Sequence, residues 1–340
     1  MKIAIDAMGG DYAPLSVLEG TAEALSCYDG FNVILVGNLP EMKPIVEKLG
    51  LDRNPRVEFA HAEQVVKMDE SSVVAIRAKK DSSITVAATL VGKGKADALV
   101  TVGHTGAAVT ATIVRMRTLP GVERPAIAVL MPSKDRKVVM LDAGATVDCK
   151  PEHLAQFAVM GSIYSRLILG IENPSIGIMS NGDEDIKGTD LTKGAFKLIS
   201  KMPVNFMGNI EGSDIFNDVV DVVVCDGFVG NAILKSCEGI SKSAMHWLKT
   251  AFTKNPFRLT TAILAQGAFQ ELKEMSSGEE YGGAPLLGIN GIVIKGHGSS
   301  SPRAVRNAIR VAADLVTKRM NEQILAKLQE SNALLKTTTK

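Results

Sequence analysis

Glycine-rich loops with polar neighbours are the most informative feature of this 340-residue sequence. Glycine lets a backbone approach an anion closely, and the first N–H groups of a helix attract negative charge. A single loop of this kind is also explained as a tight turn between a strand and a helix. Several in one chain, each beside Asp, Asn, Thr, Ser or His, predict one anion-binding cleft. The loops are Asp6–Asp11, Gly103–Ala107, Leu141–Thr146, Asp226–Asn231 and Gly296–Ser300.

The loops favour phosphate as the anion, held without a nucleotide. None matches G-x-G-x-x-G, typical of nicotinamide binding, or G-x-x-x-x-G-K-S/T, the Walker loop for ATP. We predict that phosphate is bound by Gly103, His104, Thr105, Gly106, His297, Gly298, Ser299 and Ser300. The other predicted cleft residues are Asp6, Gly9, Gly10, Asp142, Gly144, Asp226 and Gly230.

A further loop, Gly182–Asp190, combines acidic residues with one lysine. Its three adjacent acids, Asp183 to Asp185, could hold Mg²⁺ or form a solvated loop. Lys187 lies beside a glycine and could clamp phosphate or donate to a developing oxyanion, whereas most lysines of this kind are surface residues. Both interpretations of each group remain open at this point.

The sequence does not favour a covalent acyl-enzyme. It contains no G-x-S-x-G nucleophile elbow and no local Cys/His signature. The four cysteines are scattered without metal-ligand spacing, so we expect reduced thiols and no zinc site. The nucleophile is therefore expected to be a bound substrate.

Composition excludes several classes of protein. Hydrophobic residues make up 46% of the chain, which suits a large buried core. Lysine plus arginine (38) nearly equals aspartate plus glutamate (37), so nucleic acid is not an expected partner. The apolar start Met1–Ile5 runs directly into Asp6, and no apolar run reaches about 18 residues. We therefore expect a cytoplasmic protein without a signal peptide or a membrane span.

Short apolar segments alternate with helical patterns along the chain. Because most of these segments are continuously Val/Ile/Leu-rich, they predict strands buried on both faces of a largely parallel sheet. Helices are predicted from Pro151 to about Leu169, ended by Gly170, and from Pro302 onward. The predicted strands are Lys2–Ile5, Asn32–Val36, Val57–Ala60, Ala98–Val102, Ala126–Met131, Lys137–Leu141, Ser175–Met179, Val204–Met207 and Val219–Cys225.

These elements predict a doubly wound, three-layer α/β fold, in which ligands bind beyond the carboxyl ends of the strands. No linker or shift in composition marks a domain boundary. We expect one two-lobed catalytic domain over residues 1–330 and a loose tail over residues 331–340.

Residues 250–275 form an amphipathic helical segment in this interpretation. Its apolar residues Phe257, Leu259, Ile263 and Leu264 lie near Lys254 and Arg258. The pattern fits either a packed or dimer-interface helix pair, or a helix that lies in the membrane interface.

Eight strings in order along the chain resemble the bacterial phosphate acyltransferase family. They begin at residues 6, 104, 141, 182, 208, 225, 281 and 297, and read DAMGGD, HTGA, LDAGA, GDEDIKGTD, GNIEGSDI, CDGFVGN, YGGAPLLG and HGSS. One departure is Gly103-His104, where many members have Gly-Asn.

The resemblance implies transfer of a long-chain acyl group from acyl carrier protein to inorganic phosphate. The acyl phosphate product would supply phosphatidic acid and phospholipid synthesis. The resemblance also implies a fold similar to isocitrate and isopropylmalate dehydrogenases and to phosphotransacetylases, a homodimer, no metal or other cofactor, and peripheral contact with the inner face of the membrane. The catalytic residues that it implies are Lys187 and Asn231.

Three rival functions use the same features differently. A decarboxylating dehydrogenase would need convergent arginines and spaced aspartates, of which the sequence offers only one acidic cluster. A phosphotransacetylase that uses coenzyme A is closer in chemistry and is separated from the first interpretation only by the family strings. A non-enzymatic membrane scaffold would need the amphipathic segment but not the polar glycine loops.

Overall fold

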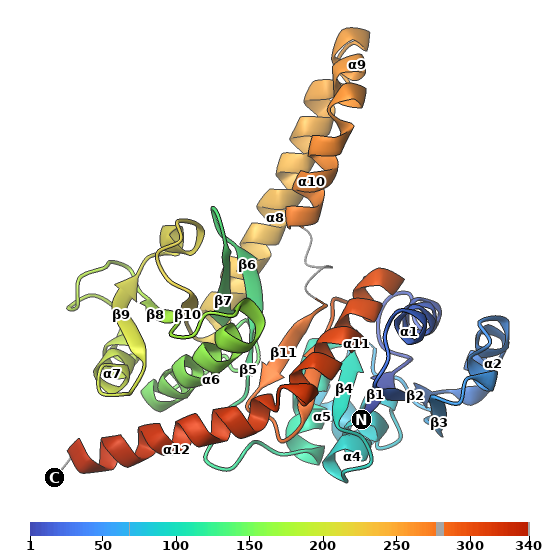
Figure 1. Cartoon of the computed structure of the whole chain (residues 1–340), viewed down its shortest axis with the longest axis horizontal. Helices are drawn as coiled ribbons and strands as arrows, with labels where there is room; N and C mark the ends of the chain where they lie inside the picture. The colour runs from blue at the N-terminus through green and yellow to red at the C-terminus, as the bar shows by residue number, and fades with distance from the viewer. Residues whose placement is uncertain (68, 277–281, 339–340) are drawn as a thin grey trace.

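A computed structural model of the protein describes residues 1–340 apart from 68, 277–281 and 339–340. Within these residues the strands form a larger sheet of seven and a smaller sheet of five (Figure 1). The strand order is β3-β2-β1-β4-β12-β11-β5 in the larger sheet and β6-β7-β10-β8-β9 in the smaller sheet.

The larger sheet is mainly parallel. Strands β1, β2, β3, β4 and β12 run in one direction, whereas β11 pairs antiparallel with both β12 and β5. Its strands are β1 (Lys2–Asp6), β2 (Asn32–Gly37), β3 (Val57–His61), β4 (Ala98–Thr101), β5 (Ala126–Ile127), β11 (Ala284–Leu287) and β12 (Ile292–Lys295).

The smaller sheet repeats this plan. Strands β7, β10, β8 and β9 are parallel, and β6 is an antiparallel edge strand. Its strands are β6 (Val129–Pro132), β7 (Lys137–Leu141), β8 (Ser175–Met179), β9 (Asn205–Ile210) and β10 (Val222–Val224).

Helices cover both faces of each sheet, which confirms the predicted three-layer α/β fold. Helices α1 and α11 pack on one face of the larger sheet, and α4 and α5 pack on the other. The helices are α1 (Leu15–Cys27), α2 (Leu39–Lys48), α3 (Ser72–Ala78), α4 (Ser83–Gly92), α5 (Thr105–Arg115), α6 (Pro151–Leu169), α7 (Asp190–Ile199), α8 (Gly227–Phe252), α9 (Pro256–Leu264), α10 (Gln266–Ser276), α11 (Pro302–Thr317) and α12 (Met320–Thr338). Two short 3₁₀ helices are η1 (Leu51–Arg53) and η2 (Gly212–Phe216).

Local signals set the ends of two predicted helices. Helix α6 begins at Pro151 and ends before Gly170, which adopts φ 71° and closes the helix in the left-handed region. Ser301 caps α11 by accepting a hydrogen bond from the N–H of Ala304 at 3.2 Å. Both predicted helices are therefore confirmed.

One predicted strand, Ala126–Met131, is instead two strands in different sheets. Its first part, β5, pairs with β11 in the larger sheet, and its second part, β6, pairs with β7 in the smaller sheet. The chain thus passes from one lobe to the other within this segment. Strands β11 and β12 were not predicted as strands.

One hydrophobic core runs through both lobes. It contains Ile3 and Ile5 from the larger sheet together with Val139 and Ile176 from the smaller sheet. Phe157 of α6 lies fully buried among them, and such a side chain contributes about 1.5–3 kcal/mol. This shared core is consistent with one domain over residues 1–330, which stays a prediction.

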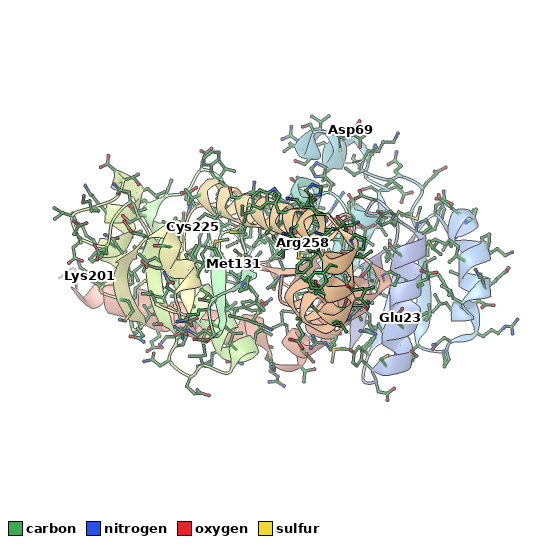
Figure 2. The ribbon with its side chains drawn as sticks, turned by 90° about the horizontal axis from the view of Figure 1, so that it is seen from above. Glu23, Asp69, Met131, Lys201, Cys225 and Arg258 are labelled. Atoms are coloured by element: carbon green, nitrogen blue, oxygen red, sulfur yellow. The ribbon has the colours of Figure 1, made fainter. Side chains whose placement is uncertain are left out.

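Helices α8, α9 and α10 form an arm that rises from the body (Figure 1), and Arg258 lies on its α9 portion (Figure 2). The rings of Phe252 and Phe269 join α8 to α10 in an edge-to-face contact with centroids 5.0 Å apart. The outer part of α8 does not pack on the body, since Trp247 is 61% exposed and Ile240 is also exposed, whereas Ile233 and Cys237 nearer its start pack against the core of the smaller sheet.

Helix α12 covers the end of the core near α6. Its Ile324 and Leu328 are buried. The helix continues to Thr338, so most of the predicted tail has helical backbone, while residues 339–340 lie outside the described part of the chain. Whether this tail is loose stays a prediction.

Candidate active site

Three glycine loops meet at the carboxyl ends of β1, β4 and β12, which are neighbours in the larger sheet. The N–H of Asp11 donates to the carbonyl of Gly298 at 2.8 Å. A Cβ atom at Gly9 would lie only 2.8 Å from the backbone nitrogen of Gly103. Glycine is needed at position 9 because no side chain fits between the two loops. The structure therefore brings these predicted site residues together.

The loop at His297 makes most of its hydrogen bonds internally. The carbonyl of His297 accepts from the N–H of Ser300 at 3.1 Å and from its hydroxyl at 2.6 Å. The hydroxyl of Ser299 lies 2.8 Å from Nδ1 of His297. These predicted phosphate donors already have partners, so they would have to exchange them to bind an anion.

His104 caps helix α5. Its Nδ1 atom accepts from the N–H of Ala107 at 3.1 Å, which leaves the ring proton on Nε2. Thr105 and Gly106 occupy the first turn of α5, where N–H groups have no partner within the helix. This turn is the part of the predicted phosphate set that is best placed to receive an anion.

Asp6 lies at the base of the three loops and is 2% exposed. Its Oδ2 accepts from the hydroxyl of Thr101 at 2.7 Å, and its Oδ1 has no hydrogen-bond partner among the described residues. Burial raises the pKa of Asp6, while the hydroxyls of Ser83 and Thr101 and the charge of Lys295 act in the opposite direction. A cavity of about 10 Å³, roughly the space of one water molecule, lies between Asp6, Ser83 and His104.

Lys295, the last residue of β12, is a site residue that sequence reasoning missed. It follows a continuous apolar run, so the pattern showed only a strand. Its ammonium group donates to the carbonyl of Gly296. Burial lowers the pKa of Lys295 to about 8, against the raising effect of Asp6 and Asp11, and the positive charge of Lys235 lowers it further.

A second group of loops follows β7 and β10, which are neighbours in the smaller sheet. Asp142 is fully buried there, and its carboxylate accepts from the backbone N–H groups of Ile127 (2.8 Å), Gly144 (3.1 Å), Ala145 (3.0 Å) and Thr146 (2.6 Å). Burial nevertheless raises its pKa to about 6, because desolvation outweighs these bonds. Asp142 thus holds its own loop in shape.

The first turn of α8 positions Asn231. Asp226 caps the helix by accepting from the N–H groups of Phe228 (2.9 Å) and Val229 (3.0 Å). A Cβ atom built on Gly144 would lie 3.5 Å from the Cβ of Asn231. Asn231, which is exposed, therefore lies beside the loop that Asp142 holds.

Lys187 lies in the loop after β8, the strand next to β10. The loop is held by two amide contacts: Asn181 accepts from the N–H of Gly188 at 2.9 Å, and Asn209 donates to the carbonyl of Glu184 at 2.8 Å. Lys187 is 43% exposed, with its ammonium 4.0 Å from the carboxylate of Glu184. It shares a sheet edge with Asn231, and among the described residues its ammonium has this wide ion pair as its one charged contact.

The two groups of loops lie against each other across the lobes. Ala143, Ala145 and Leu234 pack into the same hydrophobic cluster as Ile127 and Val293 of the larger sheet. The charge of Lys235 on α8 acts on Lys295, as described above. The start of α8 therefore faces the loops of the larger sheet.

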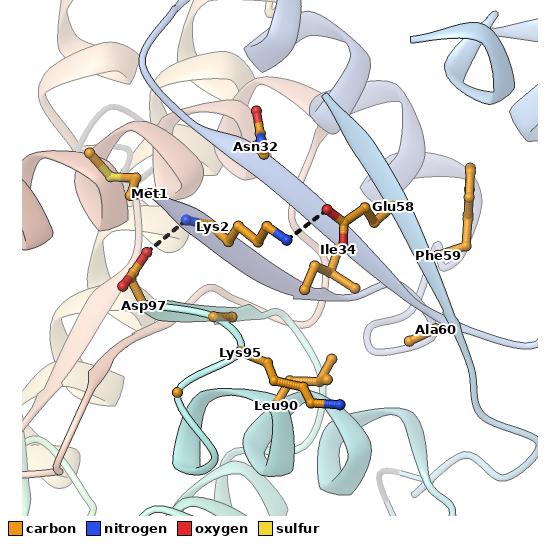
Figure 3. A pocket seen from close by; sticks show the side chains of 12 residues that line it. Met1, Lys2, Asn32, Ile34, Glu58, Phe59, Ala60, Leu90, Lys95 and Asp97 are labelled. Atoms are coloured by element: carbon orange, nitrogen blue, oxygen red, sulfur yellow. Dashed lines mark hydrogen bonds and ion pairs between the residues drawn. The ribbon is translucent and has the colours of Figure 1, made fainter. Parts of the chain in front are cut away.

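A pocket of about 630 Å³ lies at the opposite, amino end of β1 to β3 (Figure 3). Lys2 crosses it, donating its backbone N–H to Asp97 at 2.7 Å and pairing its ammonium with Glu58 at 2.7 Å. None of the predicted site residues lines this pocket. Its size alone does not make it the active site, because ligands of such sheets bind at the carboxyl ends.

The acidic loop at Asp183–Asp185 is exposed. In the part of the chain that the structure describes, no group of three or more His, Cys, Asp or Glu side chains is placed to hold a metal ion.

We predict that Gly230→Ala lowers both stability and activity. A Cβ atom there would lie 2.0 Å from the backbone oxygen of Asp142, so the start of α8 must shift and move Asn231. The expected loss of unfolding free energy is about 1–3 kcal/mol, measured by chemical denaturation. Gly239→Ala on the same helix is the matched control, because a Cβ atom there would meet no other described part of the chain within 4 Å and alanine favours the helix. Equal behaviour of the two variants would contradict the packing described here.

Comparison with known proteins gives a consistent result. The family described as "Fatty acid synthesis protein" matches residues 1–323. A protein of Nitratiruptor sp. named phosphate acyltransferase is 43% identical over 331 residues, 97% of this chain and 98% of its own length. A protein of Pelotomaculum thermopropionicum with the same name is 46% identical over 330 residues, 97% of this chain and 95% of its own length.

Solved structures show the same fold. EutD phosphotransacetylase from Staphylococcus aureus has a TM-score of 0.59 at 19% identity, covering 93% of this chain and 94% of its own. A phosphotransacetylase from Streptococcus pyogenes has a TM-score of 0.62 at 16% identity, covering 94% of each chain. The predicted likeness to the phosphotransacetylase fold is confirmed, and at this identity the likeness concerns the fold alone.

Proposed function

This chain belongs to the phosphate acyltransferase family, and from that premise we propose that it moves a long-chain acyl group from acyl carrier protein to inorganic phosphate. The phosphate oxygen attacks the thioester carbonyl, the carbon–sulfur bond breaks, and the proton of hydrogen phosphate ends on the sulfur of the released carrier. Acyl phosphate is the other product, and we propose phospholipid synthesis as its use.

The observation that carries this proposal is the meeting of the glycine loops of the larger sheet with the start of α8. The first-turn N–H groups of α5, at Thr105 and Gly106, suit the oxygens of phosphate. Both substrates are reactive once they are held within attacking distance, so positioning supplies much of the catalysis. Asn231 would donate its side-chain amide to the tetrahedral oxyanion, and Lys187 would offset the charge of the approaching dianion.

Acyl carrier protein is proposed as the donor because the family strings distinguish this chain from coenzyme A-dependent enzymes. The test is to incubate the protein with palmitoyl-(acyl carrier protein) or palmitoyl-coenzyme A, with and without phosphate. Free thiol and acyl phosphate are then measured together. Phosphate-dependent formation of both products from the carrier substrate supports the proposal. If product forms from palmitoyl-coenzyme A but not from palmitoyl-(acyl carrier protein), the acyl donor is a coenzyme A thioester. If neither substrate gives product, the proposed acyl transfer to phosphate is refuted.

We propose in addition that the arm formed by α8, α9 and α10 contacts the inner face of the cytoplasmic membrane. Phe257 is 79% and Leu264 is 88% exposed, and Leu259 and Ile263 are exposed beside them. In the described residues no helix is both long and apolar enough to cross a bilayer. An exposed apolar face of this kind suits the interface of a membrane, with Arg258 at the level of the headgroups.

The variant Ile263→Asp is predicted to lose at least about ten-fold in binding to anionic liposomes, since a buried aliphatic side chain contributes about 1.5–3 kcal/mol and the new charge is repelled. Liposome sedimentation measures the effect, and turnover with soluble substrate should stay unchanged. Met207→Asp, at an exposed apolar position of β9, is the matched control.

The predicted homodimer gives the arm an alternative role. If Ile263→Asp sediments as a monomer in ultracentrifugation while still binding liposomes, the arm forms the subunit interface and the membrane proposal fails. Unchanged binding and unchanged mass would contradict both roles for Ile263.

A further inference from the structure

Asp6, Thr101 and Lys295 form a row across three adjacent parallel strands. In the register of the sheet Ile5 pairs with Val100, which places Asp6 beside Thr101, and Thr101 pairs with Lys295. Partners in neighbouring parallel strands point to the same face of a sheet. The three polar side chains therefore share one face, at the carboxyl ends of β1, β4 and β12.

The same face of the sheet also contacts helix α8. Two residues earlier on the three strands, Ala4, Leu99 and Val293 belong to one hydrophobic cluster, against which Leu234 of α8 packs. The next residue on α8 is Lys235, which is exposed and pairs with Glu238 at 2.9 Å. Lys235 is thus one residue away from the apolar contact that joins α8 to the strands of the polar row.

Lys295 lies among charged groups that come from both lobes. The positive charge of Lys235 lowers the pKa of Lys295, and the charges of Asp6 and Asp11 raise it. An ammonium group has three N–H donors, and the described hydrogen bond of Lys295 to Gly296 uses one. A dianion bound between the two lysines would offset their repulsion. It would also accept hydrogen bonds from the remaining N–H donors of the Lys295 ammonium.

We propose that Lys295 and Lys235 bind the inorganic phosphate from opposite lobes, and that Asp6 and Thr101 position Lys295. This inference rests on the proposed function and assigns two residues to its phosphate site. Lys235 lies four residues after Asn231, on the same face of α8. Phosphate held by Lys235 and Lys295 would therefore lie beside the side-chain amide of Asn231, which would donate to the oxyanion.

The first test is the phosphate dependence of turnover in Lys295→Met and Lys235→Met. Each change removes a hydrogen bond to a charged group, so KM for phosphate should rise at least about ten-fold, with KM for the thioester unchanged. Lys242→Met, exposed on the same helix, is the matched control and should behave as the unmodified protein. A phosphate KM within two-fold of the control in both lysine variants would overturn the inference.

The second test uses pH and separates Lys295 from other cations. Below about pH 8 its ammonium is charged and binds the dianion, and above that value the proton is lost. KM for phosphate should therefore rise by up to about ten-fold per pH unit above about pH 8. In Lys295→Arg the charge persists, so the rise should be much smaller. Equal pH profiles for the two proteins would exclude Lys295 as the titrating group.

Two controls keep these outcomes distinct. Calorimetric titration with inorganic phosphate alone measures binding without turnover, so the inference can be judged even if no acyl phosphate forms and the proposed function fails. Lys295→Met leaves the buried Asp6 without a neighbouring cation, so the double variant Asp6→Asn, Lys295→Met should be made as well. Thermal melting of both variants checks that they are folded. A folded double variant that binds phosphate as the unmodified protein does would refute the proposal.

Discussion

Replacing Asn231 with alanine is expected to lower kcat by about 10²–10³, the effect of removing one donor to a developing oxyanion. Asn231 directly follows the first turn of α8, which Asp226 caps, and it lies beside the loop at Gly144. KM for phosphate and for the thioester should change far less than kcat, because the oxyanion exists only near the transition state.

A second substitution at the same position sharpens this prediction. Asn231→Asp keeps the shape of the side chain but places a negative charge where the oxyanion develops, so its kcat should fall further than that of Asn231→Ala. Ser236→Ala, exposed on the same helix, is the control and should retain full turnover. If kcat of Asn231→Ala matches that of the control, Asn231 has no role in the chemical step.

Replacing Lys187 with alanine is expected to lower kcat/KM for phosphate by about 10²-fold, the upper range for a lost hydrogen bond to a charged group. The loop that carries Lys187 is held by the amides of Asn181 and Asn209, whereas the ammonium itself, within the described part of the chain, has a 4.0 Å ion pair with Glu184 and no closer one. The side chain can leave this exposed ion pair at little cost, since such pairs contribute about 0–1 kcal/mol. It is therefore available to a dianion.

The matched control for this variant is Lys193→Ala, an exposed lysine of the following helix α7. Steady-state kinetics with varied phosphate measures both variants under the same conditions. Lys187→Arg should recover part of the lost activity, because the charge remains while the geometry changes. Should Lys187→Ala and Lys193→Ala be indistinguishable, Lys187 is a solvated loop residue, as one interpretation of the sequence allowed.

The two variants also separate the rival functions. A membrane scaffold has no need of Asn231 or Lys187, so unchanged lipid synthesis in cells carrying either variant would favour it. A decarboxylating dehydrogenase would require a divalent metal, and its product would form without phosphate. In a coenzyme A-dependent phosphotransacetylase, Asn231→Ala and Lys187→Ala would lower activity in the same way. Such an enzyme would differ only in the acyl donor that it accepts.

Several features could be predicted from local sequence because local chemistry determines them. Gly170 ends α6 and Ser301 begins α11 through hydrogen bonds and backbone angles that involve only neighbouring residues. Continuous apolar runs identified most of the parallel strands, since burial on both faces excludes polar residues. The exposed apolar residues of the arm were also visible as an amphipathic pattern, although the pattern did not say what covers them.

The tertiary structure alone decided how these elements combine. The run Ala126–Met131 reads as one strand, but its first half pairs with β11, about 160 residues away in sequence, and its second half pairs with the next strand, β7, in the other sheet. The long-range pairing depends on the packing of the whole chain, which a local pattern does not contain.

The same reason explains why Lys295 escaped prediction. Its chemistry arises from burial and from neighbours on β1, β4 and α8, none of which is adjacent in sequence. The sequence by itself determined which residue types were available for binding an anion and at which strand ends they occur. Only the tertiary structure placed Lys295 beside Thr101 and opposite Lys235, because strand register and the contact between the lobes decide which charges face one another.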